Sequence, residues 1–379
     1  MHLTRVQIPE FRALKNVDIT FEKDFTPKIF PLGSENGGGK STLLQLIFVL
    51  LYCATNRHHQ QHNTITITTH FIKNMLARYR MPEGVNRQTL AKIDIWDGKK
   101  TVQIEFFCCN DDFLKSIVSN GSEKYILRIT AYSETESLLC QVSNFPLDKI
   151  KSFLNELSEK VFLVAPSTQV CLFMPEKEKN LILKSSNKQE RGGYEDALQR
   201  TKIDLPHFFT YDFFSAEILV KYFQDARNLD FEQVVNTGEY GHRYQQILNG
   251  INQILVPGKK IMPQIQSSQA KASEDDPIKG IIFKTDNDEI LYSEDLSHGE
   301  LKRLSLYVWI QYHRMKDAIV LMDEVENGFH PDWQYRIISD LIEWGANNQY
   351  ILATHSYELC QAVTPAHVKE LEPKLLSSE

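Results

Sequence analysis

The feature that most constrains this chain is a glycine-rich segment between a strand-like run and a helical run. The apolar residues 28–32 lead into GSENGGGKST at 33–42, and an apolar helical pattern follows at 43–53. Consecutive glycines let the backbone curl with its N–H groups inward, and the following helix adds its positive N-terminus. A lysine there places a point charge on phosphates, and a hydroxyl can reach magnesium. The segment predicts a P-loop for a nucleoside triphosphate, formed by Asn36, Gly37, Gly38, Gly39, Lys40, Ser41 and Thr42.

The segment departs from the usual P-loop pattern at one position. In G-x-x-x-x-G-K-[ST] the first glycine falls on Ser34, while Gly33 lies one residue earlier. The turn must therefore accommodate a side chain at Ser34. An ordinary strand-to-helix turn is the alternative, but a turn rarely needs three consecutive glycines before Lys-Ser-Thr.

Composition narrows the class of protein. The 379 residues are 42% hydrophobic and 24% charged, which is typical of a globular chain with a large core and an inserted lobe, or with two domains. The net charge of −7 argues against an overall basic field for nucleic acid, although a local basic face stays possible. The longest apolar run, 46–54, is shorter than the ~20 residues that span a bilayer. We therefore expect a cytoplasmic protein without a membrane segment.

A second motif carries two acids at the end of an apolar strand. Residues 318–324 read AIVLMDE, as expected for a buried parallel strand, and ligands bind at the carboxyl ends of such strands. We expect Asp323 to bind magnesium, directly or through water. Glu324 is placed to orient and deprotonate an attacking water. Two acids at the end of a strand are weak evidence for a nucleotide site when they occur alone. A P-loop in the same chain makes them strong evidence for one.

Two further segments contribute candidate residues. Ser297 and Gly299 precede a helical pattern at 301–312, which gives a second helix N-terminus suited to an anion. A plain helix cap followed by an acid is the alternative there. His355 follows the apolar strand 349–353 and can reach a γ-phosphate. A structural histidine is the alternative reading.

Strand and helix patterns divide the chain into three parts. Alternating patterns at 92–96, 101–107 and 125–133 predict an antiparallel β-meander, and helical periodicity dominates 175–255. The predicted fold is α/β. Its parts are residues 1–174 with the P-loop and meander, an inserted helical lobe at 175–255, and residues 256–379 with the remaining motifs.

The order of the motifs resembles a known family. SENGGGKST, LSHGE, VLMDEVENGFHP and ATHS follow one another as in the ATP-binding-cassette (ABC) ATPases, and more narrowly in their RecF-like and OLD-like branch, also called AAA15 or AAA21. FRALKNV at 11–17 and NQIL at 252–255 also look like that branch. The resemblance spans roughly 1–54, 92–170 and 250–360 and leaves out the lobe at 175–250. It implies an ABC-ATPase P-loop fold.

The resemblance also implies roles for residues. In this family two heads sandwich two ATP molecules, so the P-loop and strand-end residues of one head act with the signature loop of the other. By analogy Asn327 lies in the loop that crosses the dimer interface, and Gln169 is the candidate for the family's Q-loop glutamine, which follows a strand after the first lobe. His298 stands where the family usually has serine or glycine. The residues implied to act in cis are Lys40, Ser41, Asp323, Glu324 and His355, and those in trans are Ser297, Gly299 and Glu300.

These implications lead to one main functional hypothesis. We expect an ATPase using ATP and Mg²⁺ that dimerises on ATP, or forms a larger assembly of dimers, and controls a partner effector. OLD-type relatives carry a Toprim nuclease domain after the ATPase, but this chain ends 24 residues beyond His355. A separate nuclease partner in anti-phage defence is therefore expected.

Two alternatives remain. A RecF-like DNA-repair ATPase would bind duplex DNA itself, for which Lys73, Arg78, Arg80, Arg87 and Lys92 offer a basic stretch. The ATPase subunit of a membrane transporter fits the motifs but not the 175–255 lobe or the ENGFHP loop.

Overall fold

The structure is a computed structural model. It describes residues 1–34, 37–53, 70–119, 126–143, 145–169, 173, 203, 205–211, 216–263, 281–292 and 295–371. The chain divides into two compact units, each described here by itself. Unit 1 comprises Met1–Thr210, Lys316–Asn327 and Gln334–Glu379, and unit 2 comprises Tyr211–Met315 and Gly328–Trp333.

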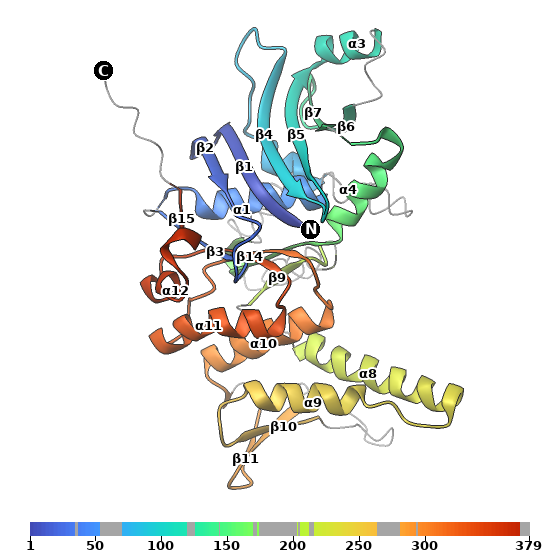
Figure 1. The fold of residues 1–379 in the computed structure, drawn as a ribbon, viewed down its shortest axis with the longest axis vertical. Helices are drawn as coiled ribbons and strands as arrows, with labels where there is room; N and C mark the ends of the chain where they lie inside the picture. Colours follow the sequence, from blue (N-terminus) through green and yellow to red (C-terminus); the bar gives the residue numbers. More distant parts are fainter. Residues whose placement is uncertain are drawn as a thin grey trace, which may run out of the picture. The chain divides into compact units, whose positions relative to one another are not determined.

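A parallel sheet forms the centre of unit 1 (Figure 1). Its strand order is β15-β3-β14-β13-β8-β9, and neighbouring strands all run parallel. Residues of β8, β13 and β14 are buried along their whole length, which explains their continuous apolar runs. The strands are β3 (Ile29–Gly33), β8 (Val161–Ala165), β9 (Phe208–Thr210), β13 (Ile319–Asp323), β14 (Gln349–Ala353) and β15 (Lys369–Glu370).

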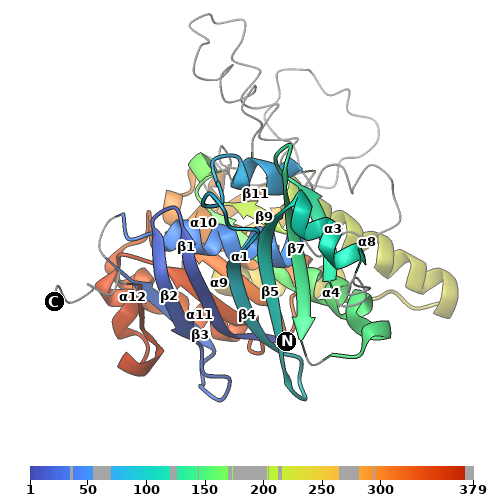
Figure 2. The ribbon, with the colours of Figure 1, turned by 90° about the horizontal axis from the view of Figure 1, so that it is seen from above.

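The second sheet of unit 1 is antiparallel and confirms the predicted meander. Its order is β2-β1-β4-β5-β7-β6, so the N-terminal hairpin extends the meander at one edge, as Figure 2 shows from above. β1 and β2 mostly alternate between buried and accessible residues, as expected where one face of a sheet is buried, whereas Phe106–Cys109 of β5 are buried consecutively. The strands are β1 (His2–Phe11), β2 (Leu14–Thr20), β4 (Arg87–Trp96), β5 (Thr101–Asn110), β6 (Ile126–Ala131) and β7 (Glu136–Ser143).

One hydrophobic cluster joins the two sheets of unit 1. It contains Leu43, Leu44 and Phe48 of α1 together with side chains of both sheets. The P-loop helix is thus fixed by apolar contacts that exclude water from its length. The helical segments of this unit are α1 (Lys40–Phe48), η1 (Val49–Cys53), residues 70–76, α3 (Asp111–Ser119), η3 (Leu147–Lys149), α4 (Ile150–Ser158), η4 (Ser167–Gln169), most of α11 (Pro331–Trp344), α12 (Tyr357–Gln361) and η7 (Pro365–His367).

Unit 2 combines helices with a small antiparallel sheet. The helices are α8 (Ala216–Thr237), α9 (Arg243–Ile254) and α10 (His298–Tyr312), and α10 contacts both of the others. The sheet has the order β10-β11-β12, with β10 (Lys259–Pro263), β11 (Ile281–Thr285) and β12 (Ile290–Leu291).

The α/β fold expected from the sequence is confirmed, but four strands were not predicted. β9 lies inside 175–255, where the sequence predicts helices, and pairs with β8 in the parallel sheet. Its three residues are too few to show a periodicity. β7, β10 and β15 were also missed. Residues 64–70 read TITITTH, an alternation that predicts one more strand; only His70 of this stretch is among the described residues, and it begins the helix 70–76. Within the described part of the chain, no helix is long and apolar enough to cross a bilayer.

Candidate nucleotide-binding site

The P-loop connects β3 to α1 at the carboxyl edge of the parallel sheet. Gly37 and Gly39 have φ angles of +84° and +91°, which other residues adopt only under strain. A Cβ atom added to Gly39 would lie 2.7 Å from Cδ2 of Leu14, so a side chain at this position would collide with the neighbouring hairpin. Glycine is therefore required where the loop enters the helix. Glu35 and Asn36 lie outside the described residues, while Gly38 and Thr42 flank the loop exit and are partly exposed.

Lys40 turns its ammonium group back over the loop. Nζ donates hydrogen bonds to the backbone oxygen and to Oγ of Ser34, both at 2.9 Å. The side chain at the position where the pattern expects glycine is thus accommodated, and its hydroxyl contacts the lysine. Burial lowers the pKa of Lys40, and the carboxylates of Asp323, Glu326 and Glu324 oppose this shift. The lysine therefore lies among the strand-end acids.

Asp323 brings the next candidates together. It ends β13, is 2% exposed, and accepts hydrogen bonds from the side chains of Gln169 and Ser41. Gln169 is itself held by Gln45, whose Nε2 donates to its Oε1 at 2.8 Å. Burial raises the pKa of Asp323, while the hydrogen bonds from Gln169 and Ser41 lower it. The order of motifs predicted Gln169 as a nucleotide-site residue. In the structure its side-chain amide donates a hydrogen bond to the carboxylate of Asp323.

Glu324 turns the chain away from β13. Its φ angle of +51° is left-handed, and its backbone N–H donates to the oxygen of Ala353 at 2.9 Å. Its Oε2 accepts from Nδ2 of Asn327 at 2.7 Å. A left-handed glutamate costs on the order of 1–2 kcal/mol, and such strain persists where neighbouring contacts enforce it. The side chain stays partly exposed beside buried Asp323.

His355 follows β14 and is exposed. Its backbone N–H donates to Oε1 of Glu326 at 2.7 Å. Sequence reasoning missed Glu326, although a third acid three residues after Asp323 is visible in DEVE. Its burial could not be read from the pattern, because an acid in a turn is usually solvated.

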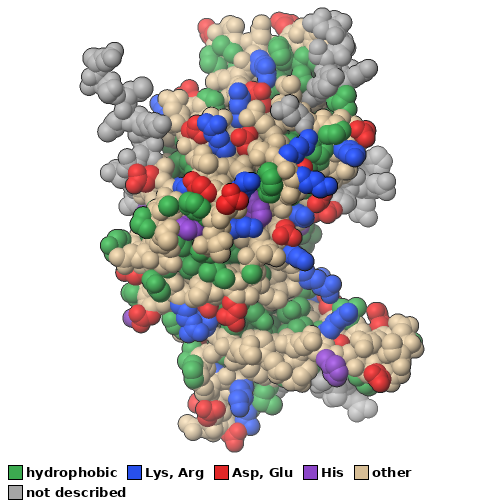
Figure 3. Space-filling view, viewed as in Figure 1, with side chains coloured by type: hydrophobic (Ala, Val, Ile, Leu, Met, Phe, Trp, Pro, Cys, Tyr) green, Lys and Arg blue, Asp and Glu red, His purple; other side chains and the backbone are tan. Residues whose placement is uncertain are grey.

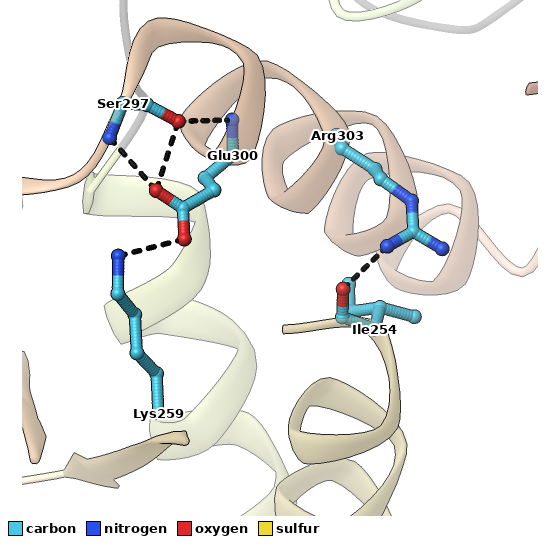
Figure 4. A network of polar contacts seen from close by, with 5 residues as sticks. All are labelled: Ile254, Lys259, Ser297, Glu300 and Arg303. Carbon is cyan, nitrogen blue, oxygen red and sulfur yellow. Dashed lines mark hydrogen bonds and ion pairs between the residues drawn. The ribbon is translucent and has the colours of Figure 1, made fainter. Parts of the chain in front are cut away.

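The predicted signature loop starts α10 in unit 2 (Figure 4). Ser297 is the N-cap and forms a capping box with Glu300: the serine hydroxyl accepts from the glutamate N–H, and Glu300 Oε2 accepts from the serine N–H at 2.9 Å. Glu300 Oε1 pairs with Nζ of Lys259 at 2.8 Å. One turn on, Arg303 donates to the oxygen of Ile254 at 2.6 Å.

Gly299 is buried next to the loop that follows the strand-end acids. A Cβ atom there would lie 3.1 Å from the oxygen of Gly328 and 3.2 Å from the Trp333 ring. A Cβ atom on Gly328, which has a φ of +82°, would lie 2.4 Å from Cδ2 of His298. The absence of side chains at Gly299 and Gly328 lets these two segments approach each other closely. The His298 ring fits at this position because Gly328 beside it has no side chain.

The capping network predicts a stability effect. Burial disfavours the charge of Glu300, but hydrogen bonds from Lys259 and Ser297 outweigh it and lower its pKa below 4.5. A lowered folded-state pKa gives stability that is present above pH 4.5 and lost as the pH falls through the folded value. Glu300→Gln is therefore expected to lower the free energy of unfolding by about 0.5–2 kcal/mol at pH 7, and by less as the pH falls below 4.5.

Urea unfolding at several pH values measures this difference. Exposed Glu289 in the same unit provides the matched control, since Glu289→Gln removes a solvated carboxylate. Equal stability of wild type and Glu300→Gln at pH 7 would contradict the assigned network.

The structure thus gathers the candidate residues in two places. The P-loop residues Gly37 to Thr42, Gln169, Asp323, Glu324 and His355 belong to unit 1, and Ser297, Gly299 and Glu300 belong to unit 2. Among the described residues there is no group of three or more His, Cys, Asp or Glu placed to hold a metal alone. The hydroxyl of Ser41 and the carboxylate of Asp323 are hard oxygen donors in contact, which suits Mg²⁺ shared with phosphates. The donor set therefore fits a magnesium nucleotide.

Comparison with known proteins points in the same direction. Residues 174–361 match the AAA_21 family model, described as "AAA domain, putative AbiEii toxin, Type IV TA system". This match includes the lobe at 175–250, which the motif order had left outside the resemblance. The DNA replication and repair protein RecF of Saccharophagus degradans is 31% identical over 104 residues, which are 27% of this chain and 26% of that protein.

Several solved structures also align with the chain. An SMC head bound to the C-winged helix domain of ScpA has a TM-score of 0.44 and 13% identity, covering 96% of this chain and 93% of that chain. The SMC head domain from Thermotoga maritima has a TM-score of 0.45 and 11% identity, covering 96% and 92%. Residues 174–361 thus resemble the AAA_21 family, a stretch of the chain resembles RecF, and the P-loop and strand-end acids are similar to those of ABC-type ATPases.

Proposed function

We propose that this protein binds ATP with magnesium at the P-loop of unit 1 and hydrolyses it. The observation that carries the proposal is the contact of Ser41 and Gln169 with Asp323 at the strand edge where Lys40 lies. These side chains come from three separate segments, and a purely structural polar cluster would not need a glycine-rich loop above it. The family match supports the same reading.

Each residue has a distinct part in the proposed reaction. Lys40 and the loop N–H groups hold the outer phosphates, and Ser41 and Asp323 hold the cation, which neutralises phosphate charge when bound. Glu324, beside the aspartate yet partly exposed, takes a proton from the attacking water. His355 contacts the γ-phosphate from the end of β14.

We further propose that two copies complete each site on binding ATP. Ser297 and Gly299 belong to a different unit from the P-loop. In the ABC arrangement that the motifs resemble, the helix start with these residues contacts the nucleotide of a partner head. The capped N-terminus of α10 offers N–H groups to phosphate oxygens.

Mixing two inactive variants tests this arrangement. Lys40→Ala disables the P-loop and Ser297→Arg blocks the signature loop, so each homodimer should lack ATPase activity. A heterodimer keeps one site with both intact halves. An equimolar mixture is therefore expected to recover up to about a quarter of wild-type activity, because half of the dimers are mixed and each has one complete site. Phosphate release from the mixture measures this. No recovery from folded proteins shown to exchange subunits would contradict the trans arrangement.

We propose that the ATP-bound dimer controls an effector, with a nuclease in anti-phage defence as the leading partner. The AbiEii-type description of the matching family fits a toxin or defence context. Purification with co-expressed neighbouring gene products, followed by mass measurement and a nuclease assay, tests it. Recovery of the chain without a partner, and no nuclease activity with any neighbour, would count against this role.

Direct DNA binding is the second candidate, favoured by the match to RecF. The basic stretch supports it only in part. Arg87 pairs with Glu105 at 2.9 Å, and Arg80 donates to the backbone oxygens of Ala77 and Tyr79. On the face drawn in Figure 3, Lys and Arg side chains are interspersed with Asp and Glu. Titration with duplex DNA at rising salt distinguishes the two candidates, since phosphate contacts weaken steeply with salt.

A further inference from the structure

Glu326 is a buried acid at the nucleotide site to which neither the motif order nor the family comparison gives a role. It lies three residues after Asp323 and is 6% exposed. A carboxylate is rarely buried to this extent unless both oxygens are partnered. The two carboxylate oxygens of Glu326 differ in their hydrogen bonding.

One oxygen fixes the loop that carries His355. Oε1 accepts the backbone N–H of His355 at 2.7 Å. The residues on either side are held by other contacts: Thr354 donates its N–H to Leu32, and the Ser356 hydroxyl caps α12 by accepting from Leu359. Glu326 is thus the side chain that holds the middle of this loop to the segment after β13.

The other oxygen has no hydrogen-bond partner among the residues that the structure describes. Oε2 is buried and unpaired, and an unpaired buried acceptor costs free energy, more so when charged. The carboxylates of Glu326 and Glu324 interact electrostatically with Asp323 and with the ammonium group of Lys40. Three negative charges therefore lie near the single positive charge of Lys40. Phosphates offer no donor to such an oxygen. A donor that also relieves the negative charge is a water molecule bound to a divalent cation.

We infer that Glu326 is a positioning residue for the cation: Oε2 accepts a hydrogen bond from a water ligand of Mg²⁺, while Oε1 holds the His355 loop. Magnesium commonly keeps several waters when few protein oxygens bind it, and here Ser41 and Asp323 supply two. Outer contacts of this kind orient metal ligands. The arrangement ties the cation to His355 through one side chain. This inference rests on the proposed ATP and magnesium binding.

Glu326→Gln separates the two oxygens. The amide keeps an acceptor for the His355 N–H and nearly the same volume, but it presents a donor where Oε2 accepted. The affinity of the ATP-loaded protein for Mg²⁺ is expected to fall about 10–100-fold, the range seen for such outer contacts. ATP affinity in EDTA should be unchanged or higher, because a negative charge near the phosphates is lost.

The measurement is a fluorescent-ATP binding titration at fixed nucleotide with increasing Mg²⁺. Asp340→Asn is the matched control, since Asp340 is a buried acid on α11 in the same unit, and its Mg²⁺ titration should match wild type. Glu326→Asp, which keeps the charge but shortens the reach, provides a second variant and is expected to show a smaller loss. Circular dichroism checks that each variant is folded.

The outcomes distinguish this inference from the proposed function. If wild type binds ATP, and every folded Glu326 variant shows the wild-type Mg²⁺ titration, the inference is overturned while the proposed function stands. If wild type does not bind ATP at all, both fail. A loss of Mg²⁺ affinity confined to the Glu326 variants supports the role of Oε2.

Discussion

Replacing Glu324 by glutamine is expected to reduce ATP turnover by about 10²–10⁴-fold while nucleotide binding survives. Glutamine keeps the size and one acceptor oxygen but loses the charge and the basicity that a proton-accepting residue contributes. Asp323 and Ser41 remain in contact, so the cation ligands are preserved. The Asn327 amide that donates to Glu324 can still donate to the new amide oxygen, so the turn should persist.

A second readout follows from the proposed dimer. If ATP holds two heads together and hydrolysis releases them, Glu324→Gln should accumulate a dimer with ATP and magnesium, seen by size-exclusion chromatography with light scattering. Glu343→Gln, an exposed acid on α11, is the matched control and should leave turnover unchanged. Near-normal phosphate release from Glu324→Gln would show that Glu324 only supports the turn.

Lys40→Ala should lower ATP affinity by at least about 100-fold, to a level that appears as no binding in most assays. Hydrogen bonds between charged groups contribute about 1.5–3 kcal/mol each, and one lysine can make more than one to phosphate oxygens. Burial lowers the pKa of Lys40, but the three nearby carboxylates oppose the shift, so we expect the ammonium to stay charged at neutral pH.

The fold should largely tolerate the Lys40 substitution. Among the described residues, the hydrogen bonds of Nζ reach Ser34 of the loop, whereas α1 is anchored by Leu43, Leu44 and Phe48 in the core. Lys151→Ala, an exposed lysine on α4, is the control for loss of a positive charge. Isothermal titration calorimetry with ATP decides the matter, and wild-type affinity in a folded Lys40→Ala protein would refute the assignment of the phosphate-binding loop.

Local sequence patterns predicted the P-loop and the strand-end acids, but not the long-range hydrogen bonds that link them to other segments. The P-loop and the acids after β13 were predictable because glycine spacing and an apolar run are visible in consecutive residues. Gln169 was found only through motif order, since nothing in its own surroundings marks it. The bond from Glu326 to His355 joins residues 29 positions apart across two strands, and no periodicity records such a contact. β9 escaped notice for a different reason, because tertiary pairing with β8 stabilises three residues with little signal of their own.

The position of β3 within its sheet has a consequence for synthesis on the ribosome. This strand lies early in the chain, yet its two neighbours, β14 and β15, come from residues 349–370. A nascent chain therefore exposes the phosphate-binding loop on an unpaired strand until residues 349–370 have been translated. Long-range pairing of this kind forms slowly and leaves strand edges open to aggregation. Early termination before residue 349 would thus remove both strands that flank β3 while leaving every residue of the P-loop in place.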